Sequence, residues 1–134
     1  MIVLVDTSVW IEFFKKSSFA ESAQLEMLIE ERRVATCLPI RAEVLSGQMS
    51  SQNRLVVSQA FQSMHQLNPD WNKQETWEKI IEFAHLAWRN GFGIPGITDR
   101  MIALASKETG AALWTLDKKL KKLAETAGIT NFEA

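Results

Sequence analysis

The amino-acid sequence predicts an α/β protein, a three-layer α/β/α sandwich built on a short parallel central sheet. Three short apolar runs support this prediction: residues 2–6 (IVLVD), 34–38 (VATCL) and 111–115 (AALWT). Unbroken apolar runs of this length are typical of strands buried on both faces, as in a parallel sheet. Helical segments separate the runs, and strands that alternate with helices favour a parallel sandwich.

Length and composition are those of one ordinary globular domain spanning residues 1–134. The chain is 46% hydrophobic and 23% charged, with a formal net charge of −1, so any contact with nucleic acid must use local patches. A single cysteine, Cys37, excludes an internal disulfide and a cysteine-rich zinc site, and it fits a reducing cytoplasm. No stretch approaches the ~20 apolar residues of a membrane span.

The first half of the chain alternates strands with amphipathic helices. Thr7 or Ser8 is expected to cap the first helix, because small hydroxyl residues suit that position. Pro39 suits the first turn of the helix after the second strand, and Gly47 is expected to end it. The helices expected in this half cover residues 7–16, 19–32, 39–46 and 52–65.

The second half is expected to hold three helices, over residues 74–90, 99–109 and 118–127. Thr98 is the expected cap of the middle one, and Gly110 and Gly128 are expected to end the last two. A brief strand is expected at Trp71 and an edge strand at residues 129–132. The apolar stripe of the helix over 74–90 either packs in the core or forms a dimer or partner surface; it comprises Trp77, Ile80, Ile81, Ala84, Ala87 and Trp88.

Four acidic side chains are expected at one edge of the sheet. Asp6 and Asp117 directly follow strands, Asp99 opens a helix after a glycine-rich loop, and Glu43 lies one turn into the helix after the second strand. In a right-handed parallel fold these positions can converge where α/β proteins bind ligands. Clustered carboxylates repel one another unless a cation neutralises them, and Mg²⁺ or Mn²⁺ prefers oxygen ligands. Such a site favours phosphodiester hydrolysis.

Each acid also has a purely structural explanation. The three aspartates all stand where a helix begins, and Asp is favoured there for capping and for the helix dipole. The apolar neighbours of Glu43 indicate a largely buried helix, where an acid needs a partner. An ion pair with Arg41 or Arg100 would provide one.

Four segments together resemble the PIN-domain family, and within it the toxin ribonucleases of the VapC type. The resemblance runs from Ile2 to about Leu123. It implies an α/β/α sandwich and an endoribonuclease that needs Mg²⁺ or Mn²⁺ and in which water attacks an RNA phosphorus in line. The segments are IVLVDTSVWIE (2–12), PIRAEVLSG (39–47), GITDRMIALAS (96–106) and LWTLDKKL (113–120).

The resemblance also implies which residues form the site. The catalytic carboxylates would be Asp6, Glu43, Asp99 and Asp117. Asp6 and Asp99 would hold the metal directly. The hydroxyl residues that would orient the acids or a water are Thr7, Ser8 and Thr115. Basic side chains near the acids are candidates for RNA contacts, namely Arg41, Arg100, Lys118 and Lys119.

A homodimer and a cognate antitoxin are further implications of the resemblance, with the toxin acting in the cytoplasm. One motif departs from the family, whose last motif often reads acid-x-acid-Phe. Here it reads Asp117-Lys118-Lys119-Leu120, which removes a fifth carboxylate and favours an alternative: a catalytically weak PIN-like module that binds a protein or nucleic acid. A third possibility is a phosphoryl-transfer domain, but a haloacid-type phosphatase needs a second Asp where Ser8 stands.

Overall fold

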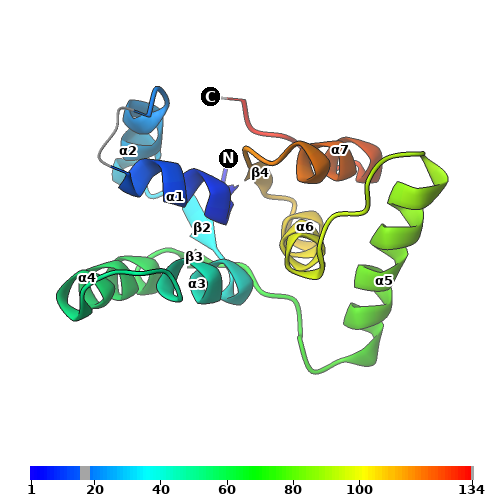
Figure 1. The fold of residues 1–134 in the computed structure, drawn as a ribbon, viewed down its shortest axis with the longest axis horizontal. Coiled ribbons are helices and arrows are strands. Elements are labelled where there is room, and N and C mark those ends of the chain that lie inside the picture. Colours follow the sequence, from blue (N-terminus) through cyan, green and yellow to red (C-terminus); the bar gives the residue numbers. More distant parts are fainter. Residues whose placement is uncertain (16–18, 134) are drawn as a thin grey trace.

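The computed structural model describes residues 1–15 and 19–133, with a four-stranded parallel sheet between layers of helices (Figure 1). β1 pairs in parallel with both β2 and β4, so that Val3 lies opposite Val34 and Ala112. The strand order is β3-β2-β1-β4. The predicted fold class is therefore confirmed. The strands are β1 (Val3–Val5), β2 (Val34–Thr36), β3 (His65–Gln66) and β4 (Ala112–Trp114).

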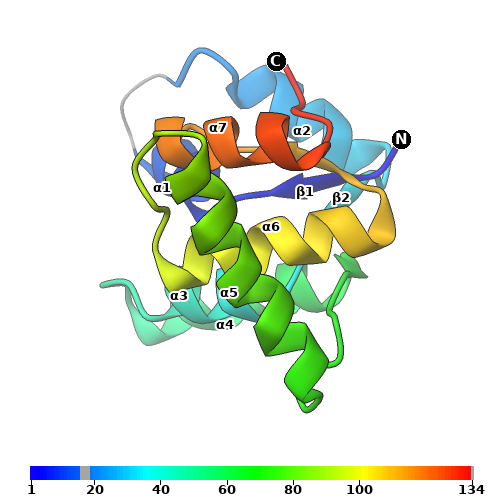
Figure 2. The same ribbon diagram turned by 90° about the vertical axis from the view of Figure 1, so that its right-hand side faces the viewer.

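Helices cover both faces of the sheet (Figures 1 and 2). One face carries α1 (Thr7–Phe14), α2 (Ser22–Glu30) and α7 (Lys118–Ala127). The other carries α3 (Leu38–Leu45), α4 (Ser51–Gln62) and α6 (Ile97–Thr109). The long α5 (Gln74–Arg89) lies outside these layers and packs on α6 and α7. No helix among the described residues has the length and apolar character needed to cross a bilayer.

The core lies around the central strands. Every residue of β1 is fully buried, as expected for a strand with helices on both sides. Trp10 and Trp114 are core residues, and the Trp10 indole donates a hydrogen bond to the Val5 carbonyl at 3.1 Å. Cys37 is also buried, and burial raises the pKa of its thiol to about 12, so it behaves as a small apolar residue.

Two helix starts differ from the prediction. Asp6, rather than Thr7 or Ser8, caps α1, because its carboxylate accepts the Ser8 N–H at 3.4 Å. Gly96 rather than Thr98 precedes α6, so this helix begins two residues earlier than expected. The predicted stops at Gly110 and Gly128 are correct, and both glycines adopt the left-handed conformation. At the expected end of the first helix, Lys16 lies outside the described residues.

The outer strand β3 lies in a different segment from the brief strand expected at Trp71. It is formed by His65 and Gln66, which were expected near the end of a helix, whereas Trp71 lies in a turn. His65 and Gln66 become a strand because they leave α4 beside the edge of β2, whose unpaired backbone groups they pair with. On the far edge, the strand expected at residues 129–132 is reduced to a single bridge between Leu113 and Asn131.

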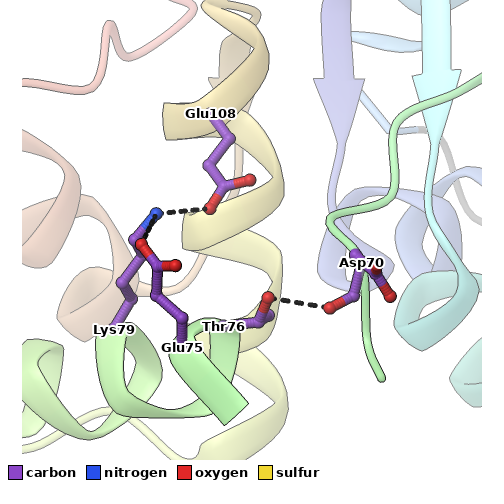
Figure 3. A network of polar contacts seen from close by, with 5 residues as sticks. All are labelled: Asp70, Glu75, Thr76, Lys79 and Glu108. Atoms are coloured by element: carbon purple, nitrogen blue, oxygen red, sulfur yellow. Dashed lines mark hydrogen bonds and ion pairs between the residues drawn. The ribbon is translucent and has the colours of Figure 1, made fainter. Parts of the chain in front are cut away.

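The apolar stripe expected on α5 divides between two environments. Ile80 and Ala87 are buried, whereas Trp77, Ile81 and Trp88 are exposed, Trp88 by 72%. The buried side of α5 faces α6, and polar contacts at its N-terminal end reinforce this packing. Figure 3 shows Lys79 between Glu75 of its own helix and Glu108 of α6. The expectation that this stripe packs in the core is therefore correct for its buried side and wrong for its exposed side.

Candidate active site

Asp6 ends β1 and provides the buried carboxylate of the candidate site. Its side chain is 3% exposed. One oxygen, Oδ2, accepts hydrogen bonds from the hydroxyls of Ser8 at 2.7 Å and Thr115 at 2.8 Å. The other oxygen, Oδ1, is buried and has no hydrogen-bond partner in the described part of the chain. A buried carboxylate oxygen without a hydrogen bond costs free energy, because it has lost its contact with water. Coordination of a cation would offset this cost.

The same two hydroxyls hold the segment that carries Asp117. Because both hydroxyl protons point to Asp6, their oxygens are free to accept backbone N–H groups. Ser8 Oγ accepts from Leu116 at 3.0 Å, and Thr115 Oγ1 accepts from Asp117 at 3.0 Å. Asp117 in turn caps α7, accepting the Leu120 N–H at 2.9 Å. The ends of β1 and β4 are therefore fixed relative to each other by hydrogen bonds.

Glu43 reaches the site from α3 in a way that differs from the prediction. It is exposed rather than buried, because α3 packs inward through Pro39, Ile40 and Val44. The carboxylate accepts a hydrogen bond from the Thr7 hydroxyl at 2.7 Å. Thr7 follows Asp6 directly, so this bond ties Glu43 to the start of α1. The structural alternative, an ion pair of Glu43 with Arg41 or Arg100, is not found in the part of the chain that the structure describes, because both guanidinium groups bind other acceptors.

Asp99, at the third position of α6, shows electrostatically that the four acids share one region. Its pKa is raised from 3.8 to about 6, first by desolvation and then by the negative charges of Asp6, Asp117 and Glu43. No basic group is among the causes of the shift. Nearby carboxylates favour the neutral form of one another unless a cation intervenes. Asp99 is therefore exposed to the negative charge of the other three acids, and none of the four forms an ion pair within the described residues.

The basic candidates fall into two classes. The Arg41 guanidinium binds the carbonyl and hydroxyl of Ser58 in α4. The Arg100 guanidinium donates to the carbonyls of Pro95 at 3.0 Å and Ile80 at 3.1 Å, linking α6 to α5. Both arginines thus have clear structural partners. Lys118 and Lys119, by contrast, are exposed at the start of α7.

The four acids fit a hard cation, because they offer carboxylate oxygens and negative charge. Mg²⁺ and Mn²⁺ take oxygen ligands, and Asp6 Oδ1 is a buried oxygen without a partner. Within residues 1–15 and 19–133, however, no three carboxylate, histidine or cysteine side chains lie close enough together to hold one ion as they stand. The structure therefore brings the predicted acids into one region without arranging them as a finished coordination shell.

An apolar groove of about 730 Å³ opens beside α1, on the side of the sheet edge formed by β2 and β3. This groove is not evident from the sequence, because Phe14, Ile29 and Val57 carry the spacing of core residues. Phe14 is in fact 44% exposed and Ile29 40%. The only sequence signal was an excess of apolar positions on short helices. The groove is lined chiefly by Trp10, Phe13, Phe14, Ile29, Val56 and Met64.

The chain resembles known proteins over nearly its full length. Residues 3–126 match the family described as the PIN domain. "VapC ribonuclease Mb1587" of Mycobacterium bovis is 27% identical over 135 residues, covering 99% of this chain and 97% of the relative. "Ribonuclease VapC32" of Mycobacterium tuberculosis is 27% identical over 128 residues, covering 96% and 94%. The chain belongs to the PIN-domain family, and over nearly its full length it is similar to these two VapC ribonucleases.

Solved structures show the same fold at lower sequence identity. VapBC2 from Rickettsia felis, bound to a DNA fragment from its promoter, has a TM-score of 0.70 and 18% identity, covering 99% of this chain and all of that chain. FitAcB from Neisseria gonorrhoeae has a TM-score of 0.70 and 16% identity, covering 98% and 97%.

Proposed function

We propose that this protein is a metal-dependent endoribonuclease that hydrolyses RNA phosphodiesters at its four-carboxylate site. One observation supports this most directly: Asp6 Oδ1 is buried without a partner, its charge acts on Asp99 together with those of Glu43 and Asp117, and no ion pair among the described residues involves these acids. Such a site is electrostatically unfavourable by itself and becomes favourable with a divalent cation. The full-length VapC ribonuclease relatives support the choice of RNA as substrate.

Each residue has a distinct role in the proposed reaction. Asp6 and Asp99 would hold Mg²⁺ or Mn²⁺, and the ion would supply positive charge for the phosphate and lower the pKa of water. Glu43 and Asp117 complete the acidic pocket and orient the attacking water. Thr7 fixes Glu43, and the hydroxyls of Ser8 and Thr115 fix Asp6 through Oδ2, which leaves Oδ1 for the ion.

The altered last motif favours one alternative, a catalytically weak binding module. Calorimetry and a cleavage assay separate the two functions. For the nuclease, Mn²⁺ should bind the protein, and cleavage of single-stranded RNA should require the ion and stop with a chelator. RNA binding without metal binding or cleavage would favour the module. A cytoplasmic site of action fits an RNA substrate and the free thiol of Cys37.

We also propose a cognate antitoxin as partner, as the family implies, and the apolar groove beside α1 as its docking surface. α1 links the groove to the candidate site, because Asp6 caps its first turn, and Trp10, Phe13 and Phe14 farther along this helix line the groove. An apolar helix in the groove would place the following residues of the antitoxin near the acids. A small open reading frame beside this gene, whose product binds the protein and blocks cleavage, is the expected observation.

A homodimer through α5 is the second proposed assembly. Ile81 and Trp88 are seven residues apart, as are Trp77 and Ala84, so all four lie along one side of α5. We call this side the seam, because apolar residues at this spacing form the contact between two paired helices. In an antiparallel pair about a two-fold axis, Trp77 meets Trp88 and Ile81 meets Ala84 of the second copy. This self-complementarity is what a closed dimer requires.

We expect the protein to have twice its chain mass of 15.2 kDa in solution, and Trp88→Glu to convert it to a monomer. Trp88 is 72% exposed, so this variant should fold normally. Light scattering measures the mass. Leu55→Glu is the matched control, because Leu55 is 59% exposed on α4, away from the seam. A monomeric wild-type protein, or a Trp88→Glu dimer, would contradict the proposed interface.

A further inference from the structure

The Lys119 side chain lies against Gly93, in the loop that joins α5 to α6. A Cβ atom built on Gly93 would be 3.0 Å from Lys119 Cε and 3.4 Å from Cδ. Any side chain at position 93 would therefore occupy the path of the lysine stem. Figure 2 shows this loop passing beside the start of α7. The loop leads to Asp99 and α7 follows Asp117, so the contact joins the two segments that carry these acids.

The Lys119 ammonium is available for a ligand. Within the described residues it forms no ion pair or hydrogen bond, whereas Arg41 and Arg100 bind protein acceptors. Its charge is not among those that shift the pKa of Asp99. Lys119 lies two residues beyond Asp117, in the first turn of α7, so its stem starts beside one of the acids while its charge is not part of their cluster. A cation placed in this way can bind an anionic substrate without occupying the metal position.

We propose that Lys119, held in place by Gly93, binds the RNA phosphate next to the one that is cut. This inference rests on the proposed nuclease function and describes how the same site holds its substrate. The phosphates of RNA must approach a negatively charged site, so a positioned cation at its edge is needed to hold the strand. Contact with Gly93 restricts the flexible lysine stem before RNA binds, which lowers the entropy lost on binding.

Binding of a short fluorescent single-stranded RNA tests the role of Lys119 without requiring turnover. The parent protein for this experiment carries Asp6→Asn, so that the RNA stays intact, and Mn²⁺ is present. Lys119→Gln should raise the Kd about tenfold, the effect of losing one charged hydrogen bond. It should also reduce the slope of log Kd against log salt by about 0.7, because one phosphate contact is lost. Lys119→Arg should restore most of the affinity.

Two further variants separate a positioned lysine from general positive charge. Lys122→Gln, an exposed lysine one turn along α7, should change the Kd by less than about twofold. Gly93→Val should weaken binding nearly as much as Lys119→Gln, because it displaces the stem. In the Lys119→Gln background it should have little further effect, since a coupled pair is not additive.

Several results would overturn the inference. One is an equal loss of RNA affinity in Lys119→Gln and Lys122→Gln, and another is an unchanged salt slope in Lys119→Gln. The others are additive effects of Gly93→Val and Lys119→Gln, or a parent protein that binds no RNA. Failure of the nuclease proposal is distinguishable from these. In that case wild-type protein would not cleave RNA with Mn²⁺, yet the Lys119 and Gly93 variants would still change RNA binding together.

Discussion

We expect Asp6→Asn to lower the rate of RNA cleavage by on the order of 10²–10³-fold, the range found when one preorganised electrostatic group is removed. The substitution keeps the size of the side chain and removes its charge. Asp6 is 3% exposed, and its negative charge raises the pKa of Asp99, so the neutral amide should be tolerated by the fold. The measurement is the rate of Mn²⁺-dependent cleavage of single-stranded RNA, with thermal unfolding as a check on folding.

Two further variants set the scale for this result. Asp70→Asn is the matched control, because Asp70 is an exposed acid in the turn before α5. This variant should cleave RNA like the wild type. Thr115→Val removes one of the two hydroxyl donors to Asp6 Oδ2 and should lower the rate by about tenfold to 100-fold, as for other residues that orient a ligand. Undiminished cleavage by Asp6→Asn would refute the proposed active site.

Much of the fold could be predicted because local signals agree with the tertiary structure. β1, β2 and β4 are apolar runs that the sheet buries, and Gly110 and Gly128 stop their helices in the left-handed conformation that favours glycine. β3 could not be predicted in the same way. His65 and Gln66 are exposed and polar, and they become a strand only because the edge of β2 lies beside them.

The residues of the candidate site were easier to predict than their surroundings. The acids follow strands or open helices, and chain topology brings such positions to one edge. The exposure of Glu43 depends on which side of α3 meets the sheet, which periodicity alone did not decide. The partners of Arg100 depend on how α5 crosses α6. These are properties of packing between elements, and no local pattern records them.

Without divalent ions, we expect the protein to become less stable as the pH rises from about 4 to about 7, and Asp99→Asn to reduce that loss. The pKa of Asp99 is about 6 in the folded protein, against an ordinary value of 3.8. Between these values the folded protein binds more protons than the unfolded chain, so the free energy of unfolding falls as the pH rises. Above about pH 7 the stability gained from proton binding at Asp99 is fully lost.

Thermal unfolding of wild type and Asp99→Asn in a chelator measures this effect. At pH 7.5 the variant should be more stable by roughly 1 kcal/mol, less than the full pKa shift implies, because Asp99 is partly exposed and solvent screens its charge. At pH 4.5 the difference should be clearly smaller, because Asp99 is still protonated in the folded protein. Mn²⁺ at about 100 times its Kd should stabilise the wild type by about 2.7 kcal/mol and the variant much less, reversing their order at pH 7.5. Equal responses of the two proteins to pH and to Mn²⁺ would show that Asp99 belongs to no shared acidic site, because charge repulsion and ion binding would then both arise elsewhere.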